Sequence, residues 1–163
     1  MSVTDTAALD QVADREILYR SVWQQPQYLV KDAEGGLRVS TAAFDDDGNE
    51  ISLFRHDLCV SPPLSNPPRV RDTDFLLSLF AFRIRQQQIS FGDKGEIMTA
   101  DVRPDTGDGQ HVSHAVVYPD RTVGKKVFRR LKKRMTEIVE EDWPIKPDAD
   151  FVAALPIKSE EAE

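Results

Sequence analysis

The alternation of apolar and polar residues predicts several short strands in the first half of the chain. Residues 16–22 (EILYRSV) alternate with the period of two that is typical of a strand. Residues 27–32 and 37–44 flank the segment AEGG, a glycine-containing connection typical of a hairpin. The turn signal DDDGN then leads into a further predicted strand, EISLFRH at 50–56. We therefore expect a β-meander at the start of the domain.

The middle of the chain combines a proline-rich connector with a segment of mixed pattern. SPPLSNPP at 61–68 fits neither a helix interior nor a central strand, because proline has no backbone N–H to donate. Residues 72–91 carry a helix-capping signal as well as a strand-like alternation, which predicts a short strand followed by a short helix. GEIMTADVRPD and HAVVYPD predict two further strands, separated by the turn-rich DTGDGQ.

From residue 122 to residue 142 the period changes to that of a helix. The apolar residues that recur at helical spacing form one stripe: Val127, Phe128, Leu131, Met135, Ile138 and Val139. The whole pattern predicts a single α+β domain over residues 13–142, in which a mostly antiparallel sheet packs against a C-terminal amphipathic helix. Residues 1–12 are predicted to be a flexible N-terminus. Residues 143–163 are predicted to be a tail rich in proline and acidic residues, with one apolar patch, DFVAALPI.

Composition adds the class and the compartment. With 40 % hydrophobic and 30 % charged residues, the chain of 163 residues has the make-up of an ordinary globular protein. Its single cysteine, Cys59, excludes an internal disulfide and fits a reducing compartment. MSVTDTAALD contains no secretion signal, and FLLSLFAF at 75–82 is too short to span a bilayer. We therefore expect a cytoplasmic protein that has no contact with a membrane.

Charge is concentrated in one block of the predicted helix. The net charge is −7, yet residues 125–134 include seven lysines and arginines and no acid. Cations at the start of a helix, and the acids at 140–142 near its end, both oppose the helix dipole, so helix stability does not explain the block. The candidate binding residues are Lys125, Lys126, Arg129, Arg130, Lys132 and Lys133.

This block predicts a binding face for an acidic partner, with a merely solvated face as the alternative. An acidic protein surface or the chain's own acidic tail fits better than nucleic acid, because no aromatic residues are interleaved and no nucleic-acid-binding motif is present. The identity of the partner and the oligomeric state stay open.

The histidines and the cysteine form two pairs, His56-x-x-Cys59 and His111-x-x-His114. Four nitrogen and sulfur ligands in two pairs are what a tetrahedral zinc site requires. Residues i and i+3 of a strand point to opposite faces, however, so each pair would need a turn. We expect neither a bound metal nor a cofactor.

Three fragments support a second hypothesis: LYR at 18–20, VSTA at 39–42 and GEIM at 95–98. Together they resemble the ADP-ribosyltransferases and the related NAD-degrading RES toxins. The resemblance implies that Arg20 binds a pyrophosphate, Ser40 braces the nicotinamide side and Glu96 stabilises positive charge on the ribose. His114 is a fourth candidate catalytic residue. The alternative function is therefore a small NAD- or nucleotide-processing enzyme.

A wider resemblance covers most of residues 16–135. LYRSV, LRVSTAAFDD, SHAVVYP and the basic helix together resemble a family of small bacterial proteins of uncharacterised function. Residues 112–113 (VS) stand where that family has proline and alanine. The resemblance implies a compact α+β bacterial domain and supplies no activity. The leading expectation is therefore a non-catalytic binding or accessory module.

Overall fold

The computed structural model describes residues 10–60, 70–107 and 109–157. Its elements are β1 (Ile17–Val22), β2 (Leu29–Lys31), β3 (Leu37–Val39), the 3₁₀ helix η2 (Thr41–Phe44), β4 (Ile51–Arg55), α1 (His56–Val60), β5 (Phe75–Phe80), α2 (Ala81–Arg85), β6 (Gln88–Phe91), β7 (Glu96–Pro104), β8 (His114–Pro119), α3 (Lys125–Ile138) and α4 (Ala149–Ala154). The connector predicted at 61–68 lies outside the described residues. None of the described helices is long and apolar enough to cross a membrane.

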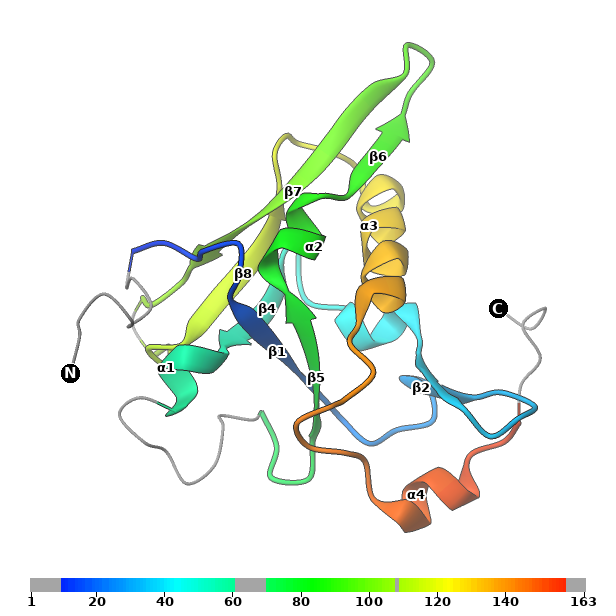
Figure 1. The fold of residues 1–163 in the computed structure, drawn as a ribbon. Coiled ribbons are helices and arrows are strands. Elements are labelled where there is room, and N and C mark those ends of the chain that lie inside the picture. Colours follow the sequence, from blue (N-terminus) through cyan, green and yellow to red (C-terminus); the bar gives the residue numbers. More distant parts are fainter. Residues whose placement is uncertain (1–9, 61–69, 108, 158–163) are drawn as a thin grey trace.

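The main sheet has six strands in the order β5-β1-β4-β8-β7-β6, and every pairing in it is antiparallel. α3 runs alongside one face of this sheet, and the long β6–β7 hairpin projects beyond it (Figure 1). The predicted α+β class with a mostly antiparallel sheet is confirmed.

The predicted opening meander is wrong. β1 pairs with β4 and β5, whereas β2 and β3 form a separate two-stranded hairpin. The hairpin itself was correctly predicted, because local turn residues define it. The neighbours of β1 come from distant parts of the chain, which local alternation does not reveal.

The predicted strand 37–44 ends at Val39, and its second half is η2. Ala43 and Phe44 of η2 are buried in the core, so the apolar pattern reports burial and not extended backbone. Two short elements were not predicted. α1 begins directly after β4, and β6 pairs with β7 through a turn in which Gly92 and Gly95 have positive φ.

The core lies between the sheet and α3. Phe128, Leu131, Met135 and Ile138 of α3 are all buried there, as the helical spacing predicted. α3 is shorter than the predicted 122–142 and is followed by α4.

The segment after α3 packs against the domain. The ring of Trp143 stacks on Phe75, with 5.6 Å between the ring centroids. The N–H of Leu76 donates to the carbonyl of Ile145, and the N–H of Glu140 donates to the carbonyl of Ser78, so this segment follows β5. Further along, Leu155 is buried in the core. The region predicted as a tail therefore contributes to the folded structure up to the last described residues.

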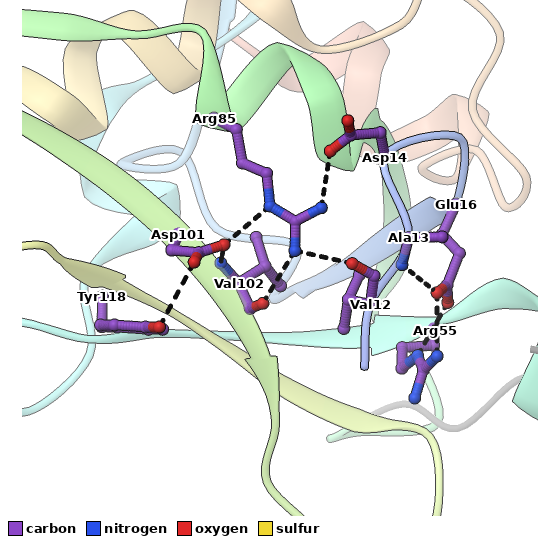
Figure 2. Close-up of polar contacts among 9 residues, drawn as sticks. All are labelled: Val12, Ala13, Asp14, Glu16, Arg55, Arg85, Asp101, Val102 and Tyr118. Carbon is purple, nitrogen blue, oxygen red and sulfur yellow. Dashed lines mark hydrogen bonds and ion pairs between the residues drawn. The ribbon is translucent and has the colours of Figure 1, made fainter. Parts of the chain in front are cut away.

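Two arginines hold the segment before β1 against the sheet (Figure 2). Arg85 bridges Asp14 and Asp101, with N–O distances of 2.7 Å to each carboxylate. Arg55 pairs with Glu16 at 2.7 Å, and both side chains are almost fully buried. The N-terminal segment is thereby fixed from residue 12 onward, where Val12 enters the core.

Candidate functional site

A pocket of about 350 Å³ opens where β1 and β4 diverge. β1 pairs with β5 over six residues, but it pairs with β4 only at Leu18 and Tyr19. We call the resulting cavity the β1–β4 pocket. Its lining residues are Arg20, Ser21, Val22, Trp23, Tyr28, Ala42, Ala43, Asp45, Asp46, Ser52, Phe54, Val70, Arg71, Gln110 and His114.

The guanidinium of Arg20 fills the gap between the two strands. Nε donates to the carbonyl of Ala43, Nη1 to Asp46 and the carbonyl of Ser52, and Nη2 to Asp46 and the carbonyl of Asp45. A guanidinium has five N–H donors, so protein acceptors use all of them. A phosphate group would have to displace these acceptors to bind Arg20.

The other charges of the pocket are also compensated. Asp46 pairs with Arg20 at 2.7 Å, and Asp45 accepts from Lys132 at 2.9 Å. Arg71 lies 3.6 Å from the buried carboxylate of Asp74. The lining therefore offers little net charge to a ligand.

His114 is the most buried titratable residue of the lining, with 7 % of its side chain exposed. Its Nδ1 lies 2.9 Å from the backbone carbonyl of Asp105. A carbonyl only accepts, so Nδ1 carries a proton in this contact, and in the tautomer with its single proton on Nδ1 the other nitrogen, Nε2, is an acceptor. Within residues 10–60, 70–107 and 109–157, no group bonds Nε2.

Three aromatic rings complete the pocket. Phe54 meets the ring of His114 edge to face, with 5.9 Å between centroids. Arg71 stacks on Trp23, with its guanidinium carbon 4.3 Å from the ring centroid, and Tyr28 contributes a third ring. Sequence reasoning missed these rings and Asp46, because nothing local shows that the 23–28 segment and the acidic turn meet β1.

The four candidate catalytic residues do not share one cavity. Arg20 and His114 both line the β1–β4 pocket, but Ser40 and Glu96 are not part of its lining. The hydroxyl of Ser40 donates to the carbonyl of Gln27, which fastens the β2–β3 hairpin. Glu96 is exposed at the start of β7, at the base of the projecting hairpin turn.

The histidine and cysteine pairs lie near the far end of β4. Nδ1 of His56 bonds the hydroxyl of Tyr19, and Nδ1 of His111 lies 2.7 Å from the hydroxyl of Ser113. Cys59 is fully buried, and burial raises the pKa of its thiol, although a hydrogen bond with Ser113 opposes the rise. In the part of the chain that the structure describes, no three His, Cys, Asp or Glu side chains are arranged to hold a metal ion.

The six candidate binding residues of α3 divide into two groups. Lys132 bonds Asp45 of the acidic turn, and Nη1 of Arg130 donates to the carbonyl of Ser90 in β6, so both tether the helix. Lys125, Lys126, Arg129 and Lys133 are exposed, together with Arg134. Arg130 is also exposed. We call the exposed cations of α3 the cationic face: Lys125, Lys126, Arg129, Arg130, Lys133 and Arg134.

Neighbouring like charges repel one another along the cationic face. Lys125, Arg129 and Lys133 follow at intervals of four residues, and so do Lys126, Arg130 and Arg134. Like charges at this spacing destabilise a helix by about 0.2–0.5 kcal/mol per pair. α3 has no acid in its first turn and no base in its last, and its N-cap, Gly124, makes no side-chain capping bond. These two rows of like charges therefore lower the stability of the helix.

An acidic turn lies on one flank of the cationic face. Asp45, Asp46 and Asp47 line a shallow groove together with Lys125 and Arg129. The Asp46 carboxylate is already engaged by Arg20, and Asp45 by Lys132. The positive potential of α3 is thus bounded on one side by carboxylates.

Comparison with protein-family models gives no match for this chain, and neither curated proteins nor solved structures give one.

Proposed function

We propose that this protein is a binding module whose cationic face on α3 contacts an acidic protein partner. The observation that carries the proposal is the pair of like-charged rows along α3. Two rows of like charges at i, i+4 spacing lower helix stability, so we infer that they gain their value from an interaction outside the helix.

The buried half of α3 supports the same conclusion. Phe128, Leu131 and Met135 anchor the helix in the core, so the orientation of its opposite face is fixed before any partner arrives. In the described part of the chain, Lys125, Lys126 and Arg129 make no ion pair with a carboxylate. Such a prearranged cluster of charges raises the rate of association with an acidic surface.

A protein partner fits this surface better than a nucleic acid. The exposed positions of α3 carry no aromatic ring on which a base could stack. The acidic turn at Asp45–Asp47 adjoins the face and repels a long polyanion, and the chain as a whole has a net charge of −7. A protein surface presents a limited acidic patch, which α3 accommodates without contact with the acidic turn.

The test is fluorescence anisotropy with two labelled probes, a deca-glutamate peptide and a single-stranded DNA decamer. We expect the peptide to bind, with an affinity that falls as salt rises. The variant K125E/K126E/R129E should lower the affinity for the peptide by at least about tenfold, since each surface ion pair contributes up to roughly 1 kcal/mol.

The matched control is R15E/K94E/K146E, which changes net charge equally at exposed cations outside α3. It should retain the peptide affinity of the unmodified protein. Equal loss in both variants would show that net charge alone acts. Tighter binding of the DNA than of the peptide would contradict the class of partner.

A further inference from the structure

We propose that the β1–β4 pocket binds a small uncharged heteroaromatic molecule that donates a ring N–H to Nε2 of His114. The site is independent of the cationic face, because it uses other residues and a different kind of contact.

The pocket has the size of a small-molecule site. Its volume of about 350 Å³ lies at the lower end of the range of about 300–1,000 Å³ for ligand pockets. It exists because β1 and β4 separate after Tyr19 and Arg20 holds them apart through bonds to Ala43 and Ser52. The cavity is therefore built into the sheet by buried hydrogen bonds.

The walls favour a flat ring. Phe54, Tyr28 and Trp23 all line the cavity. Aromatic side chains pack against planar ligands with offset or edge-on geometry, which aliphatic ligands do not exploit. Trp23 is also covered on one side by the guanidinium of Arg71, which fixes the position of its ring.

The charges favour a neutral ligand. Arg20 is saturated by protein acceptors, and Asp46, Asp45 and Arg71 each have an ionic partner of opposite sign. A phosphorylated ligand would gain no unpaired cation here and would meet two carboxylates. This compensation separates the site from a pyrophosphate-binding one.

The free acceptor specifies a donor on the ligand. Nδ1 of His114 is engaged by the carbonyl of Asp105, which leaves Nε2 as the ring nitrogen available in the cavity. His114 is almost fully buried as a residue, but Nε2 is not among the fully buried atoms without a partner in the described residues, so it is accessible from the cavity. A ring N–H of a ligand can therefore reach Nε2 and donate to it.

The experiment is an NMR shift titration of the ¹⁵N-labelled protein with indole and with 1-methylindole. The two probes share their ring and differ in the N–H donor. We expect indole to shift the amides of Ser52, Phe54 and His114 and to bind about tenfold more tightly than 1-methylindole. Equal affinities, or no shift by either probe, would overturn the proposal.

Two variants locate the effect. His114→Asn keeps a side-chain N–H near the carbonyl of Asp105 and removes the Nε2 acceptor, so it should abolish the preference for indole. His111→Asn, outside the lining, should retain that preference. If His114→Asn fails to fold, the comparison of the two indoles on the unmodified protein still decides.

Adenosine and adenosine monophosphate, which differ only in the phosphate, test the charge argument. The phosphate should improve binding by no more than about twofold. An improvement of tenfold or more would show that the pocket presents a free cation, and it would overturn the assignment of a neutral ligand.

Discussion

The Glu16 carboxylate lies 2.7 Å from Nε of Arg55, and neither side chain is more than 4 % exposed. The second carboxylate oxygen accepts from Nη2 at 2.8 Å, so the pair is bidentate. Glu16 precedes β1 and Arg55 ends β4, and the pair therefore joins the start of one central strand to the end of its neighbour (Figure 2).

Breaking this pair on one side should be costly. Glu16→Gln leaves the Arg55 charge buried without its carboxylate, and we expect a loss of about 3–5 kcal/mol in the free energy of unfolding. The double variant E16M/R55M removes both charges and should lose less than the single variant. Urea denaturation measures both, and a double variant less stable than Glu16→Gln would contradict the desolvation argument.

Truncation of a buried side chain of α3 should destabilise the protein, whereas reversal of its exposed charges should not. Leu131 is fully buried, and Leu131→Ala should cost about 2–5 kcal/mol. The variant K125E/K126E/R129E should melt at the same temperature as the unmodified protein or higher. It turns the pairs of residue 126 with Arg130 and of residue 129 with Lys133 into opposite-charge pairs, and it places acids near the helix N-terminus. Thermal melts followed by circular dichroism test this. Unfolding of the charge variant with normal melting of Leu131→Ala would reverse our assignment of the two faces.

Cys59 should be unreactive in the folded protein. Its side chain is fully buried, and burial raises the pKa of the thiol, so little thiolate forms near neutral pH. We expect iodoacetamide to label it only as fast as the protein opens, and denaturant to accelerate labelling strongly. Mass spectrometry after timed quenching gives the rate. Rapid labelling without denaturant would show that the α1 region opens freely.

Asp101 should contribute stability that acid removes. Burial raises the pKa of its carboxyl, but hydrogen bonds from Arg85 and from the N–H of Val102 outweigh burial, and the pKa lies below its ordinary value of 3.8. The unfolded chain therefore binds this proton more readily. The contribution is complete above about pH 4 and is lost as pH falls through the lower folded pKa.

Asp101→Asn lacks this contribution at every pH. Its stability deficit, measured by urea midpoints, should be largest near pH 6 and should shrink below about pH 4. Asp93→Asn on the exposed hairpin turn serves as the control, and we expect no deficit there. A deficit for Asp101→Asn that is constant from pH 6 to pH 2.5 would show that the lost contact is not ionic.

The sequence was sufficient for features that depend on local pattern. The alternation at 16–22 and 50–56 marks β1 and β4, and the 3.6-residue spacing identifies the four buried residues of α3. β4 and α3 each pack one face against the core, so hydrophobic periodicity records their structure directly. β1 buries residues on both faces, Leu18 in one hydrophobic cluster and Tyr19 in the other.

Features that depend on contacts between distant parts of the chain could not be predicted from the sequence. The segment LYR suggests that Arg20 is a phosphate ligand. Its role follows instead from the Asp46 carboxylate and three backbone carbonyls that only the fold brings near it. The β1–β4 pocket likewise depends on where two strands separate. The sequence marks His114 as a candidate, but the available Nε2 follows from the fold, which brings the carbonyl of Asp105 to Nδ1.

The path of residues 140–145 along β5 has a consequence for solubility. β5 is the terminal strand of the sheet, its sequence is FLLSLF, and an uncovered edge of this kind recruits other chains by strand addition. Backbone bonds from Leu76 to Ile145 and from Glu140 to Ser78 occupy that edge. The segment after α3 thus protects this edge from pairing with other chains. We expect a chain shortened to residue 139 to form intermolecular β-structure.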